Sequence, residues 1–509
     1  MTSIAVSTVP DRRLRSLAVP AGVDVLLVVI VSAVVYALHG FEAGLSRDLG
    51  VFVYGGEHVA RGVPPYVDIF NTVGPLADAV PGLAIWTGGL VGLDPILSAR
   101  LLFMVLSVAC CALVYVLGRD VFSSRLAGLT AAAVFLTFQD FIELASDGPR
   151  EKTTMVLFLV AALMMVQRRR WFSAGVCTGL ATLVWQPALA VAATAVVVAV
   201  LVSRVDRVRS LARFVAGGLV PSLATLVVLG ATGALSQAWA GFVTVNVFYT
   251  RQPSAWSAPA FTIGFLWHGY HLSLVVFAAG LLALLGSGTA ALRRRPPGPE
   301  VALAAAAVVG LAWTMLAING PPDLFELLPL AALGIAGALV TAVRRLPAVA
   351  AVSVVALTCT ASVGLAVVES VGSANDRLDQ QRADIAAVLA AVPSGAEVLS
   401  INAPEVLAIS GGSNPTAYQV FDGAIDRYLG HTTVGGVDGY AALVARLRPT
   451  VLVVGHGDVS RWPISLLDED YRRAGSYSSW TWYVSRSSGP ATWEAVRAAN
   501  QSVVEPASA

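Results

Sequence analysis

The sequence predicts an all-α polytopic membrane protein with about eleven transmembrane helices, followed by a small C-terminal α/β domain. The first observation is composition: hydrophobic residues make up 56% of the 509 residues, charged residues only 13%, and the mean hydropathy is +0.73. The second is length, because apolar runs that can cross a hydrocarbon core of about 30 Å recur as far as Val368. The net charge of +1 gives no sign of nucleic-acid binding.

The third observation is the placement of the basic residues, which predicts the topology. They gather in alternate connections, at 12–15, 119–125, 168–170, 204–213, 293–295 and 344–345. Because loops rich in arginine stay in the cytoplasm, we expect residues 1–22 to form a cytoplasmic tail. An odd number of spans then places the C-terminal domain outside the cell. Within the transmembrane region 23–368, the expected spans are 23–39, 97–117, 126–139, 153–167, 171–186, 187–202, 212–232, 261–286, 299–318, 324–342 and 347–368.

The apolar stretch 76–93 is long enough to span, but counting it would turn every later arginine-rich connection outward. Asp78 and Pro81 also make it a poor spanning helix. We therefore expect an interfacial or re-entrant element on the outer face, inside a long outer loop of residues 40–96. A twelfth span at 76–93 is the alternative.

After Glu369 the apolar runs shorten and charged and turn residues return. Helical periodicity at 379–392 and 440–447 alternates with strand-like runs at 396–401, 450–455 and 477–485. This alternation predicts an extracytoplasmic α/β domain over residues 369–490. Residues 491–509 are expected to be a disordered tail.

The outer loop after the first span has the composition of an active site. Asp48 follows the helix end, and Pro64 to Asp68 and Gly74 to Leu76 come soon after it. Carboxylates, aromatic residues and glycines at this density are not needed merely to join two helices. We therefore interpret residues 46–76 as an active-site loop.

A second charged stretch falls in the next outer connection, residues 139–152. It holds four carboxylates, including Asp147, together with Arg150 and the only lysine of the chain, Lys152. Polar groups near membrane depth are costly and usually functional. The alternative is a solvated loop in which 147–149 merely cap the following helix.

These features together resemble the GT-C membrane glycosyltransferases, especially the protein O-mannosyltransferase and lipid A aminoarabinose transferase branch. The likeness covers about 24–202. In it, Asp48 matches the acidic residue of the first outer loop, 61–68 match a G-x-P-Y-x-D stretch with one extra proline, and Asp147 matches the acidic residue of the second outer loop. One departure stands out: the family often has His or Lys before the proline of its G-P-L-type stretch, whereas Val73 and Gly74 precede Pro75 here.

The resemblance implies a GT-C-like fold in the cell membrane. It also implies an inverting glycosyltransferase that moves a sugar from a polyprenyl-phosphate donor in the bilayer to an extracytoplasmic acceptor. The acceptor hydroxyl needs a base, and we expect Asp48, partly buried and with raised proton affinity, to supply it.

Asp147 would orient the acceptor or bind a divalent metal ion, and metal dependence is left open. With no cation before Pro75, Arg150 and Lys152 are the candidates for the donor phosphate, and Arg251 is the reserve. The further substrate-binding candidates are Tyr54, Tyr66 and Asp68.

Two other functional classes stay open. A transporter or a flippase for lipid-linked sugars would place ionisable residues in the middle of its spans and show paired repeats. Here Asp24 is the main charge within a span and lies near its cytoplasmic end, and no repeat is visible. A non-catalytic scaffold in envelope assembly is the other alternative.

Overall fold

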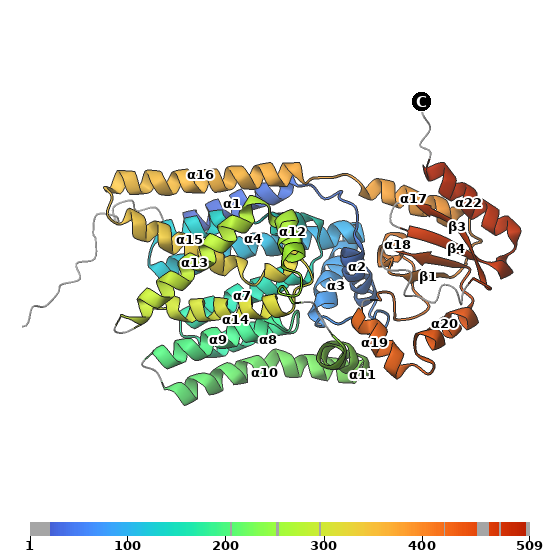
Figure 1. Cartoon of the computed structure of the whole chain (residues 1–509), viewed down its shortest axis with the longest axis horizontal. Coiled ribbons are helices and arrows are strands. Elements are labelled where there is room, and N and C mark those ends of the chain that lie inside the picture. The colour runs from blue at the N-terminus through green and yellow to red at the C-terminus, as the bar shows by residue number, and fades with distance from the viewer. Residues whose placement is uncertain are drawn as a thin grey trace, which may run out of the picture.

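A bundle of long helices and a C-terminal α/β domain lie end to end, with two short helices, α2 and α3, between them (Figure 1). The computed structural model describes residues 21–203, 206–250, 254–294, 297–421, 423–455, 468–477 and 480–504. Most of the expected tail, residues 1–20, and the last five residues lie outside this part of the chain.

In the described residues from 21 to 372, the bundle and the elements at its end beside the C-terminal domain contain helices and turns but no strand. In order, they are α1 (Ala21–Leu38), α2 (Arg47–Ala60), α3 (Leu76–Gly89), α4 (Pro95–Phe122), α5 (Arg125–Phe135), α6 (Gln139–Asp147), α7 (Glu151–Gln167), α8 (Trp171–Thr182), α9 (Ala188–Val202), α10 (Arg207–Ala231), α11 (Leu235–Trp239), the π-helix η2 (Ala240–Tyr249), α12 (Pro259–Tyr270), α13 (Leu272–Leu292), α14 (Glu300–Leu316), the 3₁₀ turn η3 (Pro321–Leu324), α15 (Leu328–Val343) and α16 (Ala348–Gly372).

Each of the eleven expected spans coincides with helix, but only some of these helices are long and apolar enough to cross a membrane by themselves. Within the described residues, α4, α10, α13 and α16 meet that test, and α5 with α6 makes a fifth if the two are counted as one broken span bent by 73°. The expected helix 261–286 is wrong as a single element. It divides into α12 and α13 at His271, whose backbone φ of 43° breaks the helix.

The stretch 76–93 forms the helix α3, which is not among the candidate spans. The two sides of α3 differ in how far they are buried. Asp78 is buried, and Gly82 packs closely against Val59 of α2, whereas Leu83 and Trp86 are exposed. This two-sidedness agrees with an element that lies against the protein on one side and against lipid on the other.

Local sequence explains how the longest helix of the bundle begins and ends. Asp94 caps α4 by accepting a hydrogen bond from the Leu97 backbone, and Pro95 occupies the first turn, where its missing N–H costs nothing. At the other end, Ser123 adopts a left-handed conformation with φ of 49°, and Ser124 then caps α5. The chain therefore reverses in a two-residue turn at the end of the bundle far from the C-terminal domain.

The C-terminal domain is a three-layer α/β unit. Its four-stranded sheet has the order β1-β2-β4-β3, in which β1 is parallel to β2 and the β3–β4 hairpin is antiparallel. The strands are β1 (Val398–Ile401), β2 (Val451–Val454), β3 (Tyr471–Tyr477) and β4 (Trp480–Ser485), and the helices are α17 (Leu378–Ala390), α18 (Pro404–Ser410), α19 (Gly423–Thr432), α20 (Gly436–Leu447), the 3₁₀ turn η5 (Arg486–Ser488) and α22 (Pro490–Val504).

Two expectations for this domain are corrected. The single strand predicted at 477–485 is a hairpin. The tail predicted to be disordered from 491 is the helix α22 as far as Val504, because Val496 is fully buried against the sheet and the Trp493 indole donates to the Arg473 carbonyl. A narrow apolar stripe on an otherwise polar helix concealed this packing in the sequence.

The C-terminal domain is docked on the first outer loop. The Tyr54 hydroxyl of α2 accepts a hydrogen bond from the Asn414 backbone at 2.9 Å. At Gly50 the two units approach so closely that a Cβ would lie 2.6 Å from the backbone nitrogen of Glu405. The Gln381 side chain of α17 accepts a hydrogen bond from the Leu45 backbone N–H at 2.7 Å and donates one to the Leu45 carbonyl at 3.2 Å. The helix that carries Asp48 is thus fixed from both sides, by the bundle and by this domain.

Candidate functional site

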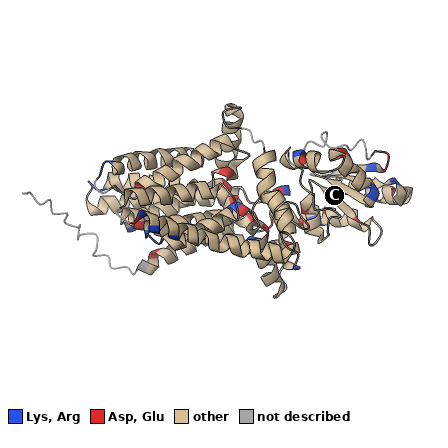
Figure 2. Ribbon diagram, turned by 90° about the horizontal axis from the view of Figure 1, so that it is seen from below, with Lys and Arg blue, Asp and Glu red and all other residues tan. Residues whose placement is uncertain are grey.

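The charged residues of the bundle lie mainly toward its two ends, and most of the ribbon between them is uncharged (Figure 2). The end that faces the C-terminal domain contains the residues predicted to be functional. Asp48 stands in the first turn of α2, where its carboxylate also complements the helix dipole. Arg150 precedes the first residue of α7, and its Nη1 lies 3.1 Å from Oδ2 of Asp48. The two outer segments singled out in the sequence therefore meet.

Asp48 has a second partner that sequence reasoning overlooked. Arg47 donates to its Oδ1 through Nη2 at 2.9 Å, so one half-exposed carboxylate sits between two guanidinium groups. Partial enclosure by the protein acts to raise the pKa of Asp48, but the charges of Arg150 and Arg47 outweigh it and lower the pKa to about 2.

The raised proton affinity expected for Asp48 is therefore wrong for the protein without substrate. The two neighbouring cations outweigh the effect of burial on which that expectation rests. A carboxylate with this pKa is ionised throughout the physiological range and is a weak base for as long as both guanidinium groups remain against it.

The two cations predicted for the donor phosphate occupy different environments. The Arg150 side chain is 14% exposed, and its Nε lies 3.3 Å from Glu151. Lys152 is buried, pairs with Asp323 and places its ammonium 4.5 Å from the centre of the Trp185 ring. Of the two, Arg150 is the one beside Asp48. Arg251 lies outside the described residues.

The environment of Lys152 explains why a compact ammonium is found there. Asp323 binds it with one carboxylate oxygen and accepts the backbone N–H groups of Asn319 and Gly320 with the other. Glu326 is fully buried in the same region, and neither of its oxygens has a hydrogen-bond donor among the described residues. The lysine thus compensates buried acidic groups, which is a structural role as the protein stands.

Asp147 is held on the bundle side of the same mouth. It ends α6, and its Oδ1 lies 2.9 Å from Nε2 of His39, which follows α1. The His39 side chain has no exposed surface, and its other ring nitrogen, Nδ1, lies 3.3 Å from the Ser370 carbonyl. This contact links the end of α6 to the residue that follows α1.

A buried arginine connects these segments. Arg100 of α4 has no exposed surface, and its guanidinium donates to the backbone carbonyls of Phe41, Ala43 and Asp147. It thereby fixes the entrance of the Asp48 loop to the end of α6. The sequence offered one signal for it, an arginine inside a predicted span, where a charge is costly without partners.

The aromatic candidates do not face an open site. Tyr54 and Tyr66 are 0% and 1% exposed; the first bonds Asn414, and the second donates to the Val73 carbonyl at 2.6 Å. Neither ring presents a face to a sugar. The Asp68 side chain is 38% exposed, and its Oδ2 lies 3.5 Å from Nε2 of His58.

The absence of a cation before Pro75 has a structural reason. A Cβ on Gly74 would lie 1.9 Å from the Leu183 carbonyl, and the Gly74 backbone donates to Val184 at 2.9 Å. Only glycine allows this approach between the first outer loop and the end of α8. A long basic side chain therefore has no room there.

The described residues contain no group of three His, Cys, Asp or Glu side chains arranged to hold a metal ion. Asp147, the metal ligand considered from the sequence, faces a histidine that is itself held by the backbone of Ser370. These residues do not fit a metal centre, and no step is assigned to one.

No protein-family model matches the chain, and no curated protein matches it in sequence. Solved structures do. Crystal structures of ArnT from Cupriavidus metallidurans, in the apo state and bound to undecaprenyl phosphate, superpose with TM-scores of 0.61 and 0.62 at 15% identity. Both alignments cover 92% of this chain, and they cover 99% of the apo ArnT chain and 100% of the ArnT chain bound to undecaprenyl phosphate.

The archaeal oligosaccharyltransferase AglB from Archaeoglobus fulgidus, in complex with an inhibitory peptide and a dolichol-phosphate, gives a TM-score of 0.53 at 14% identity. It covers 85% of this chain, and the match includes 69% of AglB. ArnT and AglB are both GT-C glycosyltransferases. The likeness confirms, at the level of the fold, the resemblance drawn from the first two outer loops.

Replacing Arg100 tests whether one buried guanidinium holds the site together. Arg100→Met keeps the apolar stem but leaves three backbone carbonyls without their donor, so we expect a loss of stability of about 3 kcal/mol or more. Thermal unfolding in detergent would measure it. Arg382→Gln is the control, because its pair with Asp94 is at the surface and should be worth under about 1 kcal/mol. Equal, small effects in both variants would contradict this role.

Proposed function

We propose that the protein is an integral membrane glycosyltransferase that moves a sugar from a polyprenyl-phosphate donor to an extracytoplasmic acceptor. The observation that carries the proposal is the pair of Asp48 and Arg150 at the mouth of the bundle. The pair supplies a carboxylate for the acceptor and a cation for the donor phosphate, and it lies in a fold like that of ArnT, whose structure has been solved with undecaprenyl phosphate. An inverting transfer is part of the proposal.

The chemistry needs both charges in separate roles. The acceptor oxygen attacks the anomeric carbon, its proton passes to a carboxylate, and the sugar–phosphate bond breaks with the electron pair leaving on the phosphate. The leaving group needs positive charge more than it needs a proton. Arg150 suits that need, since a guanidinium grips two phosphate oxygens at once.

The low pKa of Asp48 in the free protein fits this scheme when the donor phosphate takes the place of Asp48 as the partner of Arg150. When Arg150, with Arg47 beside it, turns to the incoming phosphate, Asp48 loses the charges that lower its pKa and becomes a better base. The base is thereby activated only when the donor is bound. Asp147 orients the acceptor side of the mouth, and Lys152 keeps the neighbouring acids compensated.

The contacts of Asp24 favour an enzyme over a transporter. Its carboxylate accepts two hydrogen bonds from Arg125, at 2.5 and 2.6 Å, and one from Tyr115 at 2.8 Å. A charge so fully engaged at one end of its helix stabilises the bundle and is not available to carry a substrate across it. The scaffold alternative would leave the Asp48–Arg150 pair without a purpose.

For the topology, we propose eleven spans, with the N-terminus in the cytoplasm and the site and C-terminal domain outside. The support is the arginine asymmetry together with the helices that coincide with every expected span. A reporter that is active only outside the cell, fused at the end of the chain so that α22 stays intact, should be active. Activity of a cytoplasmic reporter at the same point would overturn the span count.

Transfer itself is tested with purified protein and labelled polyprenyl-phosphate sugars. Asp48→Asn keeps the size of the side chain but removes the base, so turnover should fall by about 10²-fold or more while the protein still folds. Asp379→Asn, an equally isosteric change at an exposed position of α17, should leave turnover unchanged. Wild-type turnover in Asp48→Asn would remove the residue from this role.

The pH dependence of kcat/KM tests the coupling of Asp48 to its arginines. Activity requires ionised Asp48, and losing a cation raises its pKa, so the acid limb of the profile should move to higher pH in Arg150→Gln. Arg47→Gln should move it the same way by less, since Arg150 has the larger effect, and Arg382→Gln should not move it. An unchanged limb in Arg150→Gln would show that another group titrates.

A further inference from the structure

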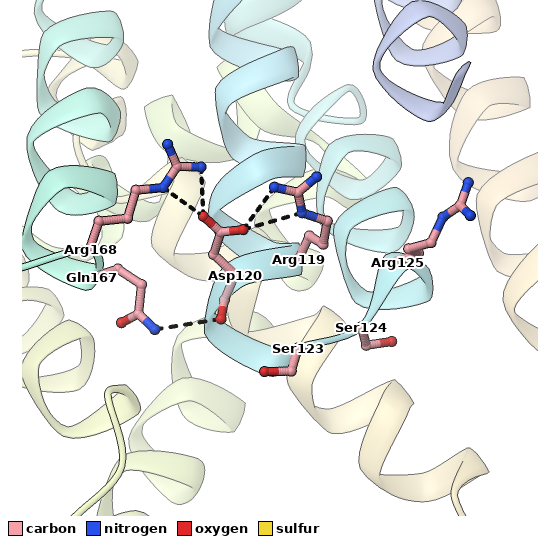
Figure 3. Close-up of a pocket in the computed structure, with 7 residues that line it drawn as sticks. All are labelled: Arg119, Asp120, Ser123, Ser124, Arg125, Gln167 and Arg168. Carbon is pink, nitrogen blue, oxygen red and sulfur yellow. Dashed lines mark hydrogen bonds and ion pairs between the residues drawn. The ribbon is translucent and has the colours of Figure 1, made fainter. Parts of the chain in front are cut away.

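A cavity of about 500 Å³ lies at the end of the bundle far from Asp48. Figure 3 shows the residues that line it. It lies where α4 ends, α5 begins and α7 ends, so residues at three helix termini line it. Its lining is almost entirely polar: Arg119, Asp120, Ser123, Ser124, Arg125, Gln167 and Arg168. The proposed transfer site uses none of these residues.

Positive charge dominates this cavity. Asp120 stands between two guanidinium groups: Arg119 donates to its Oδ1 through Nε and Nη2, at 3.2 and 3.0 Å. Arg168 donates to its Oδ2 through the same two kinds of nitrogen, at 2.9 and 2.7 Å (Figure 3). One carboxylate thus offsets only one of the two positive charges. Each guanidinium also carries five N–H groups and gives two to Asp120, which leaves donors for an anion.

The other walls add donors and no further acid. Gln167 gives a weak hydrogen bond of 3.5 Å to the Asp120 carbonyl, and the hydroxyls of Ser123 and Ser124 lie in the turn between α4 and α5. The N-terminus of α5 carries partial positive charge here, whereas the C-termini of α4 and α7 carry partial negative charge that the arginines complement. Arg125 completes the rim, and Asp24 holds it from outside the cavity.

The position of the cavity relative to the membrane indicates the source of its ligand. α4 is the longest candidate span, with 28 residues, and the cavity lies at its very end. The end of a span is the level of the lipid headgroups, and basic pockets between helices there suit phosphate-bearing headgroups. A headgroup reaches this position by lateral diffusion, still attached to its acyl chains.

We propose that this cavity is a binding site for the phosphate of an anionic membrane lipid. The phosphate oxygens take the N–H groups of Arg119 and Arg168 that Asp120 does not use, and the serine hydroxyls and Gln167 contact the rest of the headgroup. On the proposed topology the lipid belongs to the cytoplasmic leaflet. The site would hold α4, α5 and α7 together at the end of the molecule away from the reaction.

The test compares lipids and variants on the intact protein. Native mass spectrometry or thermal unfolding in a mild detergent would follow binding of phosphatidylglycerol, with phosphatidylcholine as the zwitterionic control. We expect the triple variant Arg119→Gln, Asp120→Asn, Arg168→Gln to bind phosphatidylglycerol about tenfold more weakly or worse. Changing Asp120 together with its partners avoids leaving a carboxylate unpaired, so the variant should fold.

The matched control is Arg344→Gln with Arg345→Gln, two exposed arginines of the connection after α15 that do not line the cavity. This variant should bind phosphatidylglycerol like wild type. Equal loss in both variants would mean diffuse attraction to the surface and would overturn the site. Saturable stabilisation by inorganic phosphate alone, lost in the triple variant, would overturn the lipid as the source and leave a site for soluble phosphate.

Discussion

The ion pair of Asp48 and Arg150 is the contact on which the arrangement of the mouth, the end of the bundle beside the C-terminal domain, depends. It joins the first turn of α2 to the beginning of α7, two segments 102 residues apart. Around it, Arg100 fixes the loop that leads into α2, and the C-terminal domain packs against the other face of the same helix at Gly50. A half-exposed carboxylate is thereby held in one position by parts of the chain that are distant in sequence. Such preorganisation lets a transferase distinguish the free state from the donor-bound state by a change of partner.

Charge compensation explains much of what surrounds this pair. Lys152 and Asp323 are both buried, and a buried charge without its partner costs several kcal/mol. His39 is buried beside a partly exposed Asp147, and at the far end Asp24 is buried beside Arg125, whose side chain is 38% exposed. Asp48 differs because it has two cations, and both keep some exposure to the mouth. Either guanidinium can turn from Asp48 to an incoming phosphate.

The sequence predicted the class of fold, helix within each expected span and the two charged segments that contain the candidate residues, because hydropathy and arginine bias carry that information locally. It missed what depends on long-range packing. The hairpin of β3 and β4 and the helix α22 are stabilised by contacts such as Val496 with the sheet. The low pKa of Asp48 depends on Arg150, 102 residues away, and on the orientation of the adjacent Arg47, which the sequence pattern does not give. Tyr54 and Tyr66 have the right chemistry for a sugar, and only the three-dimensional structure shows that both rings are covered.

The most direct measurement is an experimental structure of the protein with polyprenyl phosphate bound in a lipid nanodisc. Because the donor phosphate replaces Asp48 as the partner of Arg150 in this account, the phosphate should lie within about 3 Å of the Arg150 guanidinium. The same replacement predicts a separation of Arg150 from Asp48 clearly longer than the 3.1 Å of the free protein. A phosphate bound elsewhere in the mouth, with the Asp48–Arg150 pair intact, would contradict it.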